Sequence, residues 1–210
     1  MNNTTYLTVL KNTNYRRLLM ANFINRLGDS IDTIAFLWIV YSVTGEGTWS
    51  AIVFAINKIP SIIFLPLTGA FVEKRNKKQI MLICDLIRCL LVAAFTVAIV
   101  TQTLSVAFIL IFTFLISTAE AFRIPASTSF ITRILTKETL DYGVILNVIV
   151  STIVQIGGMA LGGVLLGYFN AQVVFMADVI SFIISILSIK GAGTVSSEFA
   201  VAKKMQSERS

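Results

Sequence analysis

The first long apolar stretch of this sequence carries polar side chains of the kinds that bind substrates or protons. At 100° per residue they fall within about a 120° arc, one face of a helix, and they are Asn22, Asn25, Arg26, Asp29, Asp32 and Thr33. An ionised side chain at the centre of a membrane helix costs roughly 2.5–3.5 kcal/mol, so it normally faces a bundle interior or a watery cavity. We therefore predict a substrate or proton pathway along this face, with Lys58 of the next apolar stretch as a candidate ion partner. A polar network that only fixes helix packing is the alternative.

Few other residues offer chemistry. The chain has no histidine, so proton transfer would have to use carboxylates. Cys84 and Cys89 lie five residues apart, on different faces of a helix, and are interpreted as packing residues. The sequence shows no nucleophile with a base and no cluster with metal-ligand spacing, so we expect neither enzymatic activity nor a cofactor or metal.

The composition indicates the kind of structure that holds these residues in place. Hydrophobic residues make up 56% of the 210 residues and charged residues 13%, against about 25% charged residues in soluble domains. A bilayer core about 30 Å thick needs roughly 20 apolar residues per helix, which leaves room for about six spans. The sequence thus predicts an all-α membrane protein with six transmembrane helices, at about 18–43, 48–72, 79–100, 104–123, 142–169 and 171–189.

The connections are expected to be short. Pro125 is expected to break or kink the fourth span, with residues 133–141 as a connection after it. In this division, residues 1–17 form an N-terminal tail, 18–189 a six-helix bundle, and 190–210 the start of a central cytoplasmic loop.

The cations predict the orientation. Fourteen of the 17 Lys and Arg residues fall in the two tails and in the connections of one side, and the three connections of the other side have none. Short loops rich in Lys and Arg stay in the cytoplasm. We expect a multi-pass protein of the plasma membrane with both ends of the chain cytoplasmic, and the net charge of +6 reflects topology rather than nucleic-acid binding.

The basic turn between the second and third spans has a recognisable pattern. Gly69-x-x-x-Glu73-Lys74-x-Asn76-Lys77-Lys78 resembles the loop motif of the major facilitator superfamily, usually Gly-x-x-x-Asp-Arg-x-Gly-Arg-Lys. Glu73, Lys74, Asn76 and Lys77 depart from the motif, and three of these departures keep the charge. The departure at Asn76 matters most, because glycine adopts positive φ freely and asparagine less so.

Further stretches are similar to the branch that contains macrolide-efflux proteins and the enterobactin exporter, and they lie at residues 14–18, 28–29, 44–45, 85–88 and 120–126. Residues 158–163 are similar to an antiporter motif, with Met159 in place of its proline. The family has twelve spans in two halves, so the resemblance implies an N-terminal half that needs a C-terminal six-helix half as partner.

The resemblance also implies a cytoplasmic gate of charged residues that opens in each transport cycle. Its expected members are Gly69, Glu73, Lys74, Lys77, Lys78, Asp85, Arg88, Glu120 and Arg123. The simpler interpretation pairs Asp85 with Arg88 and Glu120 with Arg123, since residues three apart are neighbours on a helix.

Small residues in the fifth span predict close helix packing. Gly158, Gly162, Gly163 and Gly167 form two overlapping small-x-x-x-small pairs, a pattern that lets another backbone approach closely. Asp178 in the sixth span is expected to be buried with a structural role first, because the resemblance puts that span outside the cavity.

The leading hypothesis is a secondary active transporter that exports an amphipathic small molecule, such as a drug, macrolide or siderophore, by proton antiport and alternating access. The alternative is a non-transporting half-bundle that acts as a membrane-embedded interaction or assembly protein. Its expected surroundings are the lipid bilayer, and no nucleic acid is expected as a partner.

Overall fold

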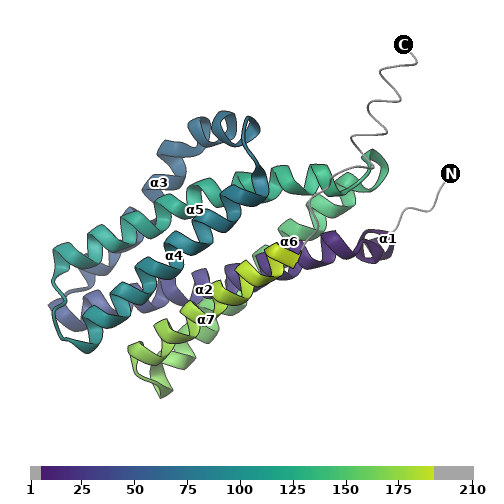
Figure 1. Cartoon of the computed structure of the whole chain (residues 1–210). Coiled ribbons are helices and arrows are strands. Elements are labelled where there is room, and N and C mark those ends of the chain that lie inside the picture. The colour runs from purple at the N-terminus through teal and green to yellow at the C-terminus, as the bar shows by residue number, and fades with distance from the viewer. Residues whose placement is uncertain (1–5, 192–210) are drawn as a thin grey trace, which may run out of the picture.

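The computed structural model describes residues 6–191, which form α-helices and, within that range, no strand (Figure 1). The helices are α1 (Tyr6–Lys11), α2 (Thr13–Thr44), α3 (Gly47–Glu73), α4 (Lys77–Val100), α5 (Val106–Ile134), α6 (Lys137–Tyr168) and α7 (Ala171–Gly191). The five helices α3 to α7 contain stretches long and apolar enough to cross a membrane. The prediction of an all-α membrane protein is confirmed. The remaining expected span, the first one at about 18–43, lies within α2, which has 32 residues but a polar face, so the count of six spans stays a prediction.

Polar residues at the helix ends set where the long helices begin and end. The side chain of Asn12 accepts hydrogen bonds from the backbone N–H groups of Asn14 and Tyr15 at the start of α2, which satisfies donors that a helix leaves free. At the other end Gly45 has φ 72°, and its N–H donates to the carbonyl of Tyr41 at 2.7 Å. Glycine adopts this left-handed conformation without steric cost, so α2 ends there.

Of the break or kink expected at Pro125, the break is wrong. Helix α5 continues through Pro125 to Ile134, and α6 begins at Lys137, so most of the connection predicted at 133–141 is helical. Proline removes one hydrogen bond from a helix, but packing holds the segment that follows, because Ala126, Phe130 and Ile131 are buried. The short helix α1 lies within the predicted N-terminal tail. Of the predicted central loop, residues 192–210 lie outside the described range.

The long helices pack as two groups of three. Helix α2 packs most extensively against α6 and α7, and α5 packs against α3 and α4. The groups meet mainly where α4 packs against α7 and α2 against α3 and α5 (Figure 1). The start of α2 and the end of α7 lie at the same end of the bundle, where Arg17 donates to the carbonyl of Gly191.

An aromatic cluster joins the groups at the opposite end. The ring of Phe36 on α2 lies 4.6 Å from that of Phe95 on α4 and 5.1 Å from that of Phe175 on α7, between centroids. All three side chains are buried. Large apolar side chains such as Ile62 and Ile153 instead lie on the outer surface, which suits a helix whose surroundings are lipid.

Two of the four predicted packing glycines make the expected close contact. A Cβ atom added at Gly158 would lie 2.7 Å from the Cβ of Ser30, and one at Gly162 would lie 3.1 Å from the Cα of Ile31. At Gly163 and Gly167 an added Cβ would meet no described atom within 4 Å. Only one side of α6 therefore needs glycine in order to approach α2.

We expect Gly158→Ala to destabilise the bundle, because α6 would have to move away from the backbone and side chains of α2. A cost within the usual 0.5–3 kcal/mol of a single substitution is expected. Thermal unfolding of the purified protein in detergent measures it. Gly163→Ala is the matched control and should leave the unfolding temperature unchanged or slightly raised, since alanine is the better helix former. Equal effects of the two substitutions would contradict the close contact.

Candidate functional site

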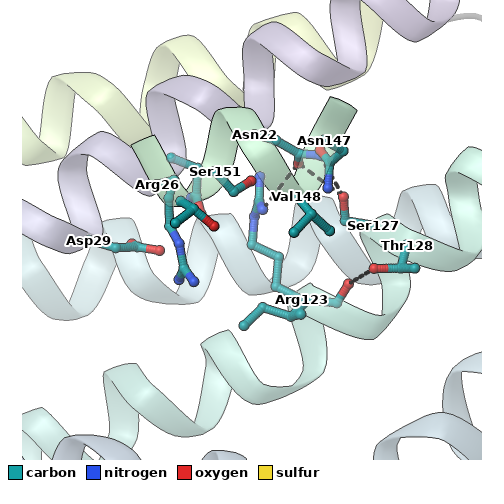
Figure 2. Close-up of a pocket in the computed structure, with 12 residues that line it drawn as sticks. Asn22, Arg26, Asp29, Arg123, Ser127, Thr128, Asn147, Val148 and Ser151 are labelled. Atoms are coloured by element: carbon teal, nitrogen blue, oxygen red, sulfur yellow. Dashed lines mark hydrogen bonds between the residues drawn. The ribbon is translucent and has the colours of Figure 1, made fainter. Parts of the chain in front are cut away.

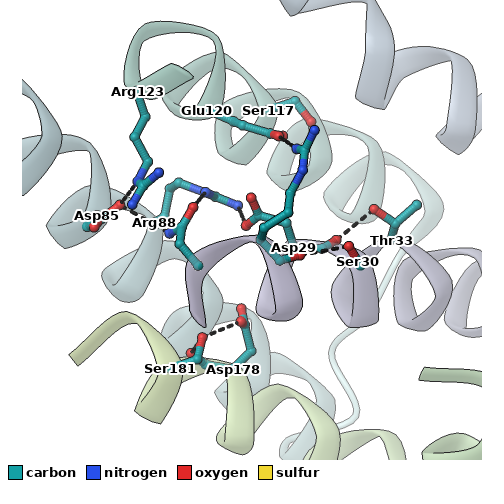
Figure 3. A network of polar contacts seen from close by, with 12 residues as sticks. Asp29, Ser30, Thr33, Asp85, Arg88, Ser117, Glu120, Arg123, Asp178 and Ser181 are labelled. Atoms are coloured by element: carbon teal, nitrogen blue, oxygen red, sulfur yellow. Dashed lines mark hydrogen bonds and ion pairs between the residues drawn. The ribbon is translucent and has the colours of Figure 1, made fainter. Parts of the chain in front are cut away.

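Three ion pairs between helices form the centre of the bundle (Figure 3). Asp29 on α2 pairs with Arg88 on α4. Arg26 on α2 pairs with Glu120 on α5, with Nη1 and Oε1 2.8 Å apart. Asp85 on α4 pairs with Arg123 on α5, with Oδ1 and Nε 2.5 Å apart. Each pair therefore joins a different two of the three helices α2, α4 and α5.

This pairing corrects the simpler prediction for the helix-end charges. Asp85 does not pair with Arg88, nor Glu120 with Arg123. Each of these arginines instead reaches a carboxylate on a neighbouring helix, because the four side chains point into the bundle and not along its surface. The face of the first span and four of the gate residues, predicted as two separate sites, form one network.

Amide and hydroxyl groups complete the network. Asn25 donates to Asp85 at 3.2 Å and accepts from Arg88 at 3.4 Å. Ser185 on α7 donates to the second oxygen of Asp85 at 2.7 Å. Asn22 donates to the oxygens of Ser127 on α5 and Asn147 on α6, both at 2.8 Å. Polar side chains of four helices, α4, α5, α6 and α7, thus meet those of α2 in one network.

The three ion pairs differ in their exposure. Asp85 and Arg88 are 0% and 1% exposed, whereas the side chains of Arg26 and Glu120 are 28% and 14% exposed. The guanidinium of Arg88 also lies 4.7 Å from the ring centre of Phe182, a favourable cation–π contact. Removing one member of a buried pair leaves an uncompensated charge, so separating either inner pair costs more free energy than separating the outer pair.

A polar pocket of about 210 Å³ lies beside the outer pair, between α2, α5 and α6 (Figure 2). Four residues of the predicted pathway line it: Asn22, Asn25, Arg26 and Asp29. The other polar residues of its wall are Arg123, Ser127, Thr128, Asn147, Ser151 and Thr152.

Five polar residues of this wall were not predicted from the sequence: Ser127 and Thr128 of α5, and Asn147, Ser151 and Thr152 of α6. Asn147 and Ser151 are four residues apart, so they share one face of an otherwise apolar helix. That spacing was the available signal, the same one that identified the polar face of the first span.

Two predicted pathway residues lie elsewhere. Lys58 is not the ion partner of Asp29, because Arg88 takes that place, and the Lys58 ammonium lies 5.6 Å from the ring centre of Phe54. Asp32 is buried beside Asp178 of α7 and does not line the polar pocket. The expected link between Lys58 and the polar face of the first span is therefore wrong in the described residues.

The basic turn is tied to the bundle end and not to the ion pairs. Asn76 has φ −73°, and its side chain accepts hydrogen bonds from the N–H groups of Lys78 and Gln79 at the start of α4. The expectation that this position requires a positive φ is therefore wrong. Lys77 donates to the carbonyl of Glu73 at 2.5 Å, and Lys78 to that of Lys190 at 3.0 Å. Gly69, Glu73 and Lys74 are exposed, and within residues 6–191 no ion pair joins Glu73 to the network.

The pocket can hold a small molecule through hydrogen bonds and one partly exposed cation. Its wall offers amide, hydroxyl and guanidinium donors together with the oxygens of Asn147 and Asp29. Over residues 6–191, no group of three His, Cys, Asp or Glu side chains is placed to hold a metal ion. Binding and release of a solute suit this arrangement.

A family model and a known protein are similar to this chain. The family model MFS_3, described as transmembrane secretion effector, matches residues 4–206. The protein named uncharacterized MFS-type transporter YkuC, from Bacillus subtilis (strain 168), is 24% identical over 183 residues. That alignment covers 87% of this chain and 42% of the relative, so the chain spans less than half of the relative's length.

Proposed function

The chain belongs to the transmembrane secretion effector family of MFS-type transporters, and we propose that it forms part of an exporter and binds the substrate of that exporter. The substrate is an amphipathic small molecule, such as a drug, macrolide or siderophore. It is exported by alternating access in exchange for protons, across the plasma membrane, and a C-terminal six-helix half supplies the opposite wall of the pathway.

The observation that carries this proposal is the polar pocket next to an ion pair that is only partly buried. Arg26 both lines the pocket and pairs with Glu120. A solute with hydrogen-bond acceptors can therefore compete with Glu120 for the guanidinium, while the buried pairs hold α2, α4 and α5 together. Exchange of that partner gives bound solute a way to bias the helix arrangement, as a ligand must if it drives a conformational change.

The test is transport by the whole protein to which this chain belongs, reconstituted in vesicles. With a panel of amphipathic substrates, we expect efflux that responds to an imposed pH gradient. Efflux without any response to the gradient would refute proton antiport. No flux of any substrate would refute export and favour the assembly role.

The proposed orientation follows from the cation distribution and predicts which connections reach the cytoplasm. In a background without Cys84 and Cys89, we expect a cysteine at position 76 to react only with a reagent present inside the cell. Cysteines at positions 47 and 102 should react with a membrane-impermeant reagent added outside. Labelling of position 76 from outside intact cells would reverse the orientation.

A further inference from the structure

The network leaves two buried carboxyl groups without a cation. Its three arginines, Arg26, Arg88 and Arg123, are each paired with one carboxylate. Asp32 and Asp178 are 3% and 2% exposed, and neither forms an ion pair within residues 6–191. A buried, unpaired carboxylate is strongly disfavoured relative to water, so these two groups need another source of stabilisation.

The two carboxyl groups lie within hydrogen-bonding reach of each other, Asp32 on α2 and Asp178 on α7. Neither oxygen of Asp32 has a donor among the described residues, and nor has Oδ2 of Asp178. The other oxygen of Asp178, Oδ1, accepts from Ser181 at 2.9 Å (Figure 3). Three carboxylate oxygens are therefore buried without a hydrogen-bond partner.

The backbone of α2 is shaped for this contact. Gly28 lies one turn before Asp32, and a Cβ atom added there would be 2.0 Å from Oδ1 of Asp178. Only glycine leaves room for the Asp178 side chain against α2. The approach of the two carboxyl groups is thus supported by the sequence of both helices.

The groups that face the pair do not neutralise it. Helix α4 contributes Arg88 and Cys89, α2 contributes Asp29, and α7 contributes Ser181. Arg88 attracts both carboxyl groups, but its guanidinium is bound to Asp29, whose own charge repels them. Two bare carboxylates in contact repel each other, whereas one proton between them turns the repulsion into a hydrogen bond.

We propose that Asp32 and Asp178 form a carboxyl pair that holds one proton between them, and that this is the proton exchanged for substrate. The second part rests on the proposed antiport. It narrows the predicted proton pathway, which included both Asp29 and Asp32, to a contact between α2 and α7, and leaves Asp29 as the fixed partner of Arg88.

A route for the proton lies beside Asp32. A cavity of about 10 Å³ is lined by Asp29, Asp32, Asn57 and Glu120, and that volume is about what one water molecule requires. Asp29 also lines the larger polar pocket. When α2 and α7 move apart, the O–H bond of the pair breaks, the proton passes to water, and both carboxylates keep their electron pairs.

Infrared spectroscopy tests the shared proton directly, because the carbonyl stretch of a protonated carboxyl group differs from that of a carboxylate. The whole protein is used, with ¹³C in its aspartate side chains so that glutamate does not contribute. We expect wild-type protein at pH 7 to show a protonated aspartate band. If wild-type protein lacks this band, the proposal is overturned, whatever the spectra of the variants show.

The band should be lost in Asp32→Asn and in Asp178→Asn, because the amide then donates to the remaining carboxylate and replaces the proton. Asp141→Asn, at an exposed carboxylate, is the control and should keep it. If the single variants fail to fold, the double Asn variant, which has no buried charge at this site, should fold and lack the band. A band that survives in either single variant, or in the double variant, overturns the pair.

Export by wild-type protein under a pH gradient separates this proposal from the proposed function. If the band behaves as expected but export does not respond to the pH gradient, the shared proton is supported, whereas antiport and the coupling role of the pair are refuted. If export follows the gradient but the band is absent, antiport stands and the carboxyl pair falls.

Discussion

Asp85→Asn is expected to destabilise the folded protein strongly. It removes the charge that neutralises Arg123 while nearly keeping the shape of the side chain, and Asp85 and Arg123 are 0% and 5% exposed. Breaking a buried ion pair from one side costs about 3–5 kcal/mol, a large part of a total stability of roughly 5–15 kcal/mol. Size-exclusion chromatography and thermal unfolding in detergent measure the loss, and Arg123→Gln should cause a similar one.

The double variant Asp85→Asn/Arg123→Gln tests whether the loss of stability comes from the unpaired charge. It has no buried charge at this contact, and its two amides can hydrogen-bond, so it should be more stable than either single variant. Asp141→Asn changes an exposed carboxylate and should unfold at the wild-type temperature. Additive losses in the double variant would show that the two charges do not depend on each other.

Asp32→Asn is expected to abolish accumulation driven by a pH gradient while exchange of substrate at equilibrium remains measurable. The amide resembles the protonated acid in shape and hydrogen bonding but cannot release a proton. Transport of a labelled substrate in vesicles, with and without the gradient, measures both quantities. A wild-type response to the gradient in this variant would place the coupling group elsewhere.

Asp29→Asn should behave differently, although it lies only three residues away. It would leave the buried Arg88 without its carboxylate, so the main expected loss is of folded protein. Normal stability of this variant together with loss of the gradient response would assign the coupling role to Asp29.

Hydropathy and charge, read along the chain, determined much of the architecture. The apolar stretches match helices α3, α4 and α7 closely, whereas α5 and α6 extend beyond the predicted spans, and the polar face of α2 follows from the spacing of its residues. These properties are local, because whether a segment enters a bilayer depends on its own residues, and so does the face on which its polar groups lie. The basic turn, which resembles the loop motif of the major facilitator superfamily, indicated the superfamily, and the comparisons show it.

Only the tertiary structure decided which charges meet. Asp85 and Arg88 have the spacing of a pair within one helix, yet each binds a residue of another helix. Gly158 and Gly163 fit the same small-residue pattern, yet only Gly158 contacts α2. Asp178, expected to be structural, lies against Asp32, 146 positions earlier in the sequence. Pairing of buried groups depends on which helix faces meet and at what depth, and packing between distant segments fixes both.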